Sequence, residues 1–276
     1  MAGHLRNPCS SIPMDGLPAR EAAFSIVAPR LLATFRAGVA TMPFVRRSLY
    51  ALGLALVAVC AAAVAAAPVP AFTAHYRLLR DGSQIGTATV TLVQGRDNTW
   101  TYTTASRGTS GLASLLGANV KEESTFQWVG NLPQGDSYDY SMDTALKQKH
   151  RTVRFDWRTH TIEVNDRGIH SFATQPGVLE RHTVPLALIA GLRAGKTTFA
   201  LPVAVRDRIQ LQHYRVRGHQ EVSVPAGTFQ AIDVTRTDGG DPFEAWFAPE
   251  QLPVPVKLDQ RGKDEFSLEL ESWSKG

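Results

Sequence analysis

The stretch Thr87-Ala88-Thr89-Val90-Thr91-Leu92 alternates threonine with apolar residues, which is the pattern of a β-strand. Successive side chains of a strand point in opposite directions, so Ala88, Val90 and Leu92 share one face and the threonines share the other. A strand with one apolar and one polar face is typical of an antiparallel sheet that buries only one side. This stretch therefore predicts a sheet with one buried and one wet face.

The same period of two recurs along the chain from Phe72 onward. Further alternating runs lie in Trp100–Thr103, Tyr138–Asp143, Val153–Trp157 and Phe266–Glu271. Turn-forming residues separate such runs, for example Asp81-Gly82 and Pro225-Ala226-Gly227. This spacing predicts a mostly β fold of about ten to twelve antiparallel strands. A sheet of that size must curl, so we expect a barrel or half-barrel, with a sandwich as the alternative.

Two segments depart from the strand pattern. We predict one short helix over Thr183–Arg193, with Thr183 as its cap, Pro185 in its first turn and Gly195 just beyond its end. Its apolar stripe is expected to plug the sheet or to pack on it. The small apolar segment Gly111–Gly117 is expected to form a helical turn or a flap.

The amino-terminal part of the sequence has the three-part pattern of a secretory signal. Arg46 and Arg47 form a basic segment, an uncharged apolar run follows over Leu49–Val64, and small residues end at Ala66. We therefore expect an over-extended start over residues 1–41, a signal peptide over residues 42–66, and a single β-rich domain over residues 67–276.

This pattern predicts export to the periplasm, with the signal cleaved. One alternative is a leader that stays uncleaved and anchors the chain, which would be its only membrane contact. The other is lipidation at Cys60, which is disfavoured because Val59 stands where a small residue is needed.

The positive charge of the chain belongs to its leader. The whole chain has a net charge of +4, and residues 1–66 alone carry six arginines against Asp15 and Glu21. The remainder is therefore neutral, and we expect no nucleic-acid partner. Both cysteines, Cys9 and Cys60, also lie in the leader, so the mature chain has no disulfide and no thiol for chemistry.

We assign no catalytic, metal-binding or cofactor-binding residue from the sequence, and expect no cofactor. Gly195-Lys196-Thr197 resembles the end of a phosphate loop, but Ala190 stands where a glycine is needed, which favours a helix stop and a turn. Gly108-Thr109-Ser110-Gly111 lacks the Gly-x-Ser-x-Gly spacing of a nucleophilic serine.

We also assign no functional site to the histidines or to the clustered arginines of the mature chain. No two of the histidines have the sequence spacing of metal ligands with a carboxylate nearby. These histidines are His75, His150, His160, His170, His182, His213 and His219. A local basic cluster is interpreted as a solvated strand face and consists of Arg206, Arg208, Arg215 and Arg217. The ligand-binding residues stay unassigned.

The most specific segments are Val222–Arg236, Glu244–Pro249 and Pro253–Asp259. With the early strand Tyr76–Gly86, they resemble the bacterial family DUF3108, a domain of unknown function, and the resemblance runs from Phe72 to Trp273. In such proteins the segment that corresponds to Thr183–Gly195 usually opens with an acidic residue. His182-Thr183 stands there in this chain, so any role of that acid would not transfer.

The resemblance implies no assigned activity, and three functions stay open. The leading hypothesis is a non-enzymatic protein that binds an apolar or amphipathic ligand, such as a lipid or lipidated peptide, in the concavity of a curved sheet. The architecture implied by the resemblance is similar in outline to periplasmic lipid-carrier half-barrels, an analogy of fold only. The second hypothesis is an envelope assembly or scaffold module that contacts another envelope protein. The third is a hydrolase, which requires a cleft that joins at least two titratable groups.

Overall fold

The computed structural model describes residues 66–111, 117–261 and 265–276. The predicted over-extended start, all of the predicted signal peptide except Ala66, and residues 112–116 of the expected flap lie outside these residues.

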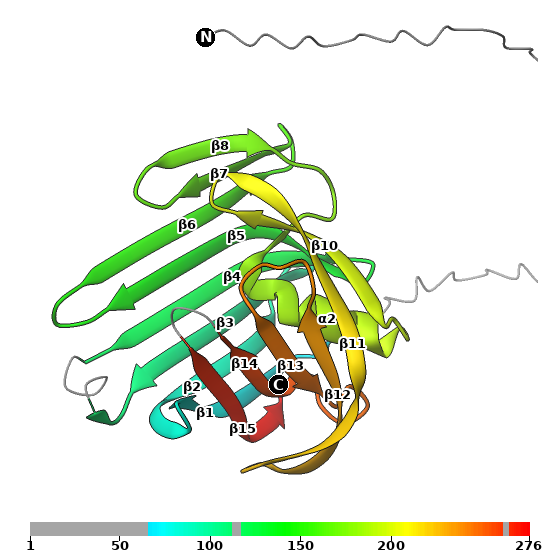
Figure 1. The fold of residues 1–276 in the computed structure, drawn as a ribbon. Coiled ribbons are helices and arrows are strands. Elements are labelled where there is room, and N and C mark those ends of the chain that lie inside the picture. Colours follow the sequence, from blue (N-terminus) through cyan, green and yellow to red (C-terminus); the bar gives the residue numbers. More distant parts are fainter. Residues whose placement is uncertain (1–65, 112–116, 262–264) are drawn as a thin grey trace, which may run out of the picture. The chain divides into compact units, whose positions relative to one another are not determined.

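The described part of the chain is built almost entirely of strands (Figure 1). The strands are β1 (Phe72–Arg80), β2 (Ser83–Gln94), β3 (Thr99–Gly108), β4 (Asn119–Val129), β5 (Leu132–Asp143), β6 (Gln148–Asp156), β7 (Thr161–Asn165), β8 (Ile169–Ala173), β9 (Leu179–Glu180), β10 (Thr198–Val205), β11 (Arg208–Val224), β12 (Gly227–Arg236), β13 (Phe243–Phe247), β14 (Pro255–Gln260) and β15 (Phe266–Lys275). A 3₁₀ turn, η1 (Arg181–Thr183), follows β9 and leads into the helix α2 (Val184–Arg193).

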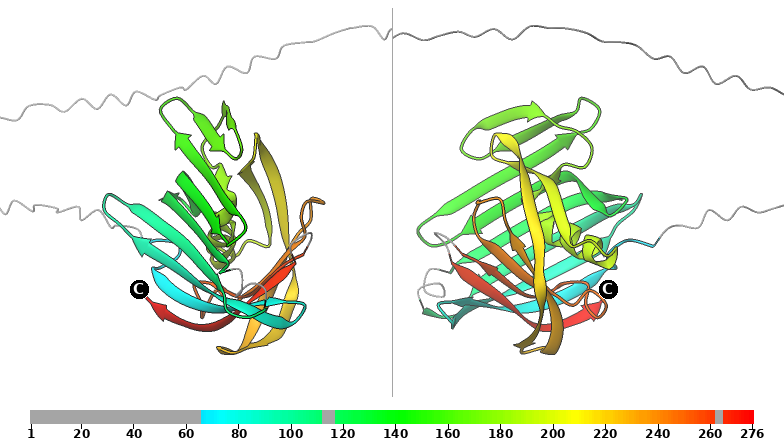
Figure 2. Two further views of the ribbon diagram at one scale, coloured as in Figure 1. Left: turned by 90° about the vertical axis from the view of Figure 1, so that its left-hand side faces the viewer. Right: turned by 45° about the vertical axis from the view of Figure 1, so that its right-hand side comes forward.

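These strands form one 15-stranded sheet with the order β8-β7-β6-β5-β4-β3-β2-β1-β15-β14-β13-β12-β11-β10-β9. The two-residue strand β9 pairs with β10 in parallel, and the other neighbours pair antiparallel. The end strands β8 and β9 do not pair, so the sheet is not closed. It bends into a trough with β4–β8 in one wall and β10–β12 in the other (Figure 2). The predicted curved, mostly β fold is confirmed.

The predicted strand number of about ten to twelve is wrong, and turn chemistry explains part of the difference. The hairpin of β6 and β7 turns through His160 at φ 54°, and that of β10 and β11 turns through Arg206 at φ 56°. Residues other than glycine rarely adopt positive φ, so neither turn carries a clear signal in the sequence. Arg206 therefore belongs to a turn, and the predicted arginine-bearing strand face does not include it.

The apolar face of the sheet lies inside the curve. Ala88, Val90 and Leu92 are 2%, 5% and 0% exposed. The apolar side chains of the Thr87–Leu92 run therefore point inward, as predicted. The same inner face continues through register partners, such as Tyr76 opposite Ala88 on β1 and Leu270 opposite Tyr76 on β15. The larger of two buried hydrophobic clusters among the described residues therefore joins strands that are distant in the sequence.

The predicted helix is present as α2, inside the curve of the sheet (Figure 1). It is buried along nearly its whole length, as expected of a helix that is apolar on all sides. At its end the Gly195 amide donates to the Leu192 carbonyl at 2.9 Å, and the Lys196 amide donates to the Gly191 carbonyl at 3.0 Å. These two bonds form a Schellman motif with Gly195 at φ 76°. The interpretation of Gly195-Lys196-Thr197 as a helix stop is confirmed.

None of the helices among the described residues combines the length and the apolar character that a membrane crossing requires.

Candidate functional site

A buried carboxylate organises the turn between β9 and α2. Glu180 is 1% exposed, and its Oε2 accepts the His182 amide at 2.6 Å, while its Oε1 accepts the Thr183 amide at 2.8 Å. Oε1 also accepts the Ser124 hydroxyl at 2.7 Å. Burial raises the pKa of Glu180 above its ordinary value. The carboxylate thus satisfies amide donors that the start of a helical segment leaves unpaired.

This arrangement corrects two predictions from the sequence. The side chain of Thr183 does not cap α2, because its hydroxyl donates to the Glu180 carbonyl oxygen at 3.1 Å. An acidic residue does open this helical segment, and it is Glu180, two residues before His182. Sequence reasoning placed the start at His182-Thr183 because it did not anticipate the 3₁₀ turn that precedes the helix.

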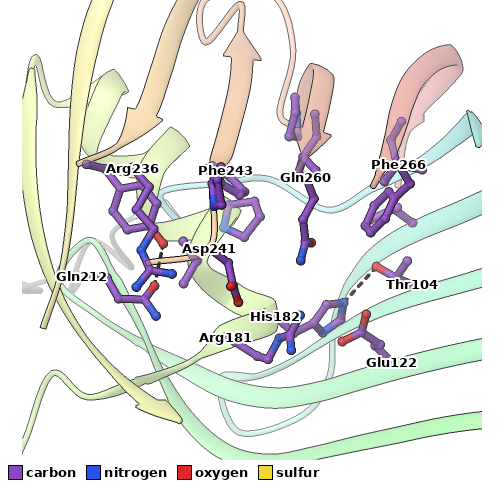
Figure 3. A pocket seen from close by; sticks show the side chains of 18 of the residues that line it. Thr104, Glu122, Arg181, His182, Gln212, Arg236, Asp241, Phe243, Gln260 and Phe266 are labelled. Atoms are coloured by element: carbon purple, nitrogen blue, oxygen red, sulfur yellow. Dashed lines mark hydrogen bonds between the residues drawn. The ribbon is translucent and has the colours of Figure 1, made fainter. Parts of the chain in front are cut away.

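A chain of hydrogen bonds runs from Glu180 into the interior of the trough. Ser124 donates to Glu180, so its oxygen accepts from His182 Nδ1 at 2.8 Å. His182 Nε2 then accepts the Thr104 hydroxyl at 2.9 Å (Figure 3). The Tyr102 ring packs on the imidazole with 4.5 Å between ring centroids. We call Thr104, His182, Ser124 and Glu180 the polar relay.

Strand register brings the members of the relay together. Thr104 on β3 lies opposite Glu122 on β4, and Ser124 on β4 lies opposite Tyr102 on β3 and Tyr138 on β5. These side chains therefore share the inner face of the sheet, next to η1. Ser124 is fully buried, whereas Thr104 and His182 line a cavity. Thr104 is thus the hydroxyl of the relay that a bound molecule can reach.

The cavity, which we call the main cavity, has a volume of about 240 Å³ and lies between η1, the start of α2 and the inner face of the sheet. Its apolar lining is Tyr76, Val90, Tyr102, Val184, Pro185, Val205, Tyr214, Pro242, Phe243, Pro255, Leu258, Phe266 and Leu268. Its polar lining is Thr104, Glu122, Arg181, His182, Gln210, Gln212, Arg236, Asp241 and Gln260. Figure 3 shows Arg181, His182 and Glu122 facing Phe243, Gln260 and Phe266 across this space. The cavity is therefore amphipathic.

Three charged groups of the main cavity, Arg181, Glu122 and Asp241, have no ion-pair partner within the described part of the chain. The Arg181 guanidinium makes no hydrogen bond or ion pair with a described residue, and Arg181 is exposed. Partial desolvation opposes its charge, but the nearby Glu122 carboxylate raises its pKa. Glu122 accepts the Tyr138 hydroxyl on Oε2 at 2.6 Å. Burial, and then this carboxylate, raise the pKa of Tyr138. The charges of Arg181 and Glu122 therefore remain available to a bound molecule.

A second cavity of about 570 Å³ shares Arg181, Arg236 and Asp241 with the main cavity. We call it the arginine hollow, because its lining includes Arg151, Arg181, Arg206, Arg208 and Arg236. Three of these arginines have an ion-pair partner: Arg151 contacts Asp166 at 2.6 Å, Arg236 contacts Asp238 at 2.7 Å, and Arg208 contacts Asp207 at 3.8 Å.

All four arginines are exposed, in line with the interpretation of a solvated cluster, but they do not form one strand face. Arg206 and Arg208 line the arginine hollow, at the turn between β10 and β11. Arg215 and Arg217 lie farther along β11, where Arg217 contacts Glu244 at 3.0 Å. The four arginines are close in sequence, but their side chains lie in different environments.

Among the residues that the structure describes, no group of three His, Cys, Asp or Glu side chains is arranged to hold a metal ion. The sequence also gave no signal that singled out His182 from the other histidines. Glu180 offered a weak signal, since an acidic residue just before a proline-containing helix start is a frequent cap. Thr104 and Ser124 could be found only once the strand register was known.

The family model DUF3108, described as a protein of unknown function, matches residues 71–269. The chain belongs to the DUF3108 family. The match spans the polar relay and nearly all of the sheet, so both cavities lie within the DUF3108 domain.

No curated protein matches the sequence. Among solved structures, the DUF3108 chain is similar to the crystal structure of a beta-barrel-like protein of domain of unknown function DUF1849 from Brucella abortus. The TM-score is 0.49 at 13% sequence identity, and the similarity covers 75% of this chain and 98% of that chain.

Proposed function

We propose that this domain binds an amphipathic, lipid-like molecule in the main cavity, without a chemical step. The observation that carries the proposal is the Arg181 guanidinium, which lines the amphipathic main cavity and forms no ion pair with a described residue. Arg181 is exposed, so water solvates its charge, and the guanidinium is free to pair with an anionic group of a bound molecule. A ligand with a polar head and an apolar tail fits both parts of the lining.

The size of the two cavities supports this proposal. The main cavity, at about 240 Å³, lies just below the roughly 300–1,000 Å³ of small-molecule sites, and the adjoining arginine hollow of about 570 Å³ extends the space available to a ligand. Apolar walls with a few polar groups are the usual composition of such sites, because the apolar area provides affinity and the polar groups fix orientation.

The scaffold hypothesis receives less support from the same structure. It requires a filled interior and a contiguous exposed apolar patch. The interior contains cavities, and the exposed large apolar side chains among the described residues lie on different segments, namely Val93, Val129, Leu146, Ile169, Leu211 and Trp273. These observations favour ligand binding over a scaffold role.

The proposal includes the location of the domain. We propose export to the periplasm, because residues 42–66 carry the pattern of a secretory signal. The predicted cleavage after Ala66 would leave β1, which begins at Phe72, intact.

A fluorescent fatty-acid analogue, 11-(dansylamino)undecanoic acid, tests the proposed binding. We expect saturable binding with a blue shift, and lipid in an organic extract of the purified protein analysed by mass spectrometry. Leu268→Trp fills the main cavity, and we expect it to weaken binding about tenfold or more. Ser267→Trp is the matched control, since Ser267 lies beside Leu268 on β15 but outside the lining, and it should bind as the wild type does. A lipid-free extract together with no saturable binding would refute the proposal.

A second function, ester hydrolysis, is favoured by the polar relay alone. An imidazole within hydrogen-bond reach of a hydroxyl, and oriented by a further group, is the arrangement that activates a nucleophile. The Thr104 oxygen would attack an ester carbonyl carbon while His182 Nε2 takes its proton and passes it to the departing alcohol. Water would then hydrolyse the acyl-threonine.

A p-nitrophenyl ester assay tests this second function. Hydrolysis by the wild type should be lost in Thr104→Val and retained in Thr104→Ser. Equal rates for the wild type and Thr104→Val would exclude this function, and the binding proposal would stand.

A further inference from the structure

Opposite charges face the same cavity without forming an ion pair. Arg181 and Glu122 both line the main cavity, and no ion pair joins them. They are close enough for the Glu122 charge to raise the pKa of Arg181. Figure 3 shows both groups on the side of the cavity that carries His182.

The fold holds these two charges in place independently. Glu122 is fixed by β4 and by the Tyr138 hydroxyl on its Oε2, and its Oε1 accepts no hydrogen bond from a described residue. Arg181 belongs to η1, which the Glu180 carboxylate anchors through the amides of the next two residues. Each group therefore presents free hydrogen-bonding capacity to the cavity.

The chemistry of these charges restricts the polar head of the proposed ligand. An anionic head would pair with Arg181 but be repelled by Glu122 and by Asp241, which also lines the cavity. A cationic head would pair with Glu122 or Asp241 but be repelled by Arg181. A neutral head would leave all of these charges unpaired. A head that carries one anionic and one cationic group satisfies both sides.

We propose that the ligand is a zwitterionic amphiphile whose primary ammonium binds Glu122 and whose phosphate or carboxylate binds Arg181. This inference rests on the proposed function, because the tail must occupy the apolar side formed by Phe243, Phe266 and Leu268. A primary ammonium is specified because it donates hydrogen bonds to a carboxylate, which a quaternary ammonium cannot do.

Three single-chain lipids of equal chain length test the inference by competition with the dansyl probe. They are lysophosphatidylethanolamine, lysophosphatidylcholine and lysophosphatidylglycerol. We expect the ethanolamine lipid to bind about tenfold more tightly than the other two. Glu122→Gln should remove this preference by weakening only the ethanolamine lipid, because Gln keeps an acceptor for Tyr138 but loses the charge. Arg181→Gln should weaken all three lipids.

Arg215→Gln is the matched control, since Arg215 is an exposed arginine of β11 outside both cavities, and it should leave all affinities unchanged. Far-ultraviolet circular dichroism and thermal unfolding confirm that each variant is folded. Phosphoethanolamine without a chain separates a free metabolite from a lipid as the source of this head. If phosphoethanolamine displaces the probe as effectively as the lipid does, the proposal that the ligand is an amphiphile is refuted.

The outcomes separate the two proposals. If none of the lipids and no dansyl probe binds the folded wild type, the proposed function fails. If all three lipids bind within twofold of one another, or if Glu122→Gln keeps the preference, the zwitterionic head is refuted while amphiphile binding stands. A preference that disappears in Glu122→Gln and survives in Arg215→Gln supports the inference.

Discussion

Substitution of Glu180 by alanine removes the carboxylate that organises the turn between β9 and α2. Its two oxygens accept the amides of His182 and Thr183 and the hydroxyl of Ser124, at distances between 2.6 and 2.8 Å. The side chain is 1% exposed, so water does not replace it readily. Each of these donors would lose its acceptor in a buried place.

The magnitude follows from these contacts. Loss of a helix cap costs about 0.5–2 kcal/mol, and a buried donor without an acceptor costs about 1–3 kcal/mol. Removal of a buried carboxyl also relieves the penalty of burying it, which offsets part of the sum. We therefore expect Glu180→Ala to lower the free energy of unfolding by about 2–4 kcal/mol.

Urea unfolding at pH 7, followed by tryptophan fluorescence and circular dichroism, measures this change. Glu271→Ala is the control, because Glu271 is exposed on β15 and should change stability by less than about 0.5 kcal/mol. Glu180→Gln keeps one oxygen as an acceptor but places an amide group against the His182 amide, so an intermediate loss is expected. A loss below about 1 kcal/mol in Glu180→Ala would refute the assigned role of this carboxylate.

Three further predictions concern pH, packing and processing. Because burial raises the pKa of Glu180 in the folded state, its contribution to stability is present below the ordinary pKa and declines as pH rises through the raised value. Urea titrations should therefore show the wild type gaining stability relative to Glu180→Gln as pH falls from neutral toward the ordinary value. A Cβ on Gly191 would overlap the Phe199 ring, so Gly191→Ala should lower the free energy of unfolding by about 1–3 kcal/mol, whereas Gly218→Ala, with open space around its Cβ, should be nearly neutral. Mass spectrometry of the protein from the periplasm of a bacterial host should find an amino terminus at Ala67, and an intact leader or a lipid on Cys60 would contradict cleavage there.

The fold was predictable where local pattern decides it. The alternation of Thr87–Leu92 determines which side chains turn inward, because the period of a strand is a property of its backbone alone. The end of α2 was equally readable, since Gly195 at positive φ provides the helix stop. The number of strands could not be predicted in this way, because His160 and Arg206 adopt positive φ in turns although their residue types do not favour it.

The candidate site was not predictable from the sequence, for a different physical reason. Thr104 and Ser124 lie on different strands and meet His182 only because the sheet curves and η1 turns into it. Each residue alone has an ordinary role in a strand or turn. Arg181 likewise becomes notable only because the fold places its guanidinium at a cavity, with no ion pair to a described residue.

Three consecutive residues of one turn lie in three different environments. Glu180 bonds to Ser124 and is buried, Arg181 faces both cavities, and His182 bonds to Thr104 at the wall of the main cavity. The amide bonds to Glu180 fix the backbone of this turn, and that backbone determines where the Arg181 guanidinium stands. Stability and the proposed ligand recognition of this domain therefore depend on the same carboxylate, which itself lines the arginine hollow but not the main cavity.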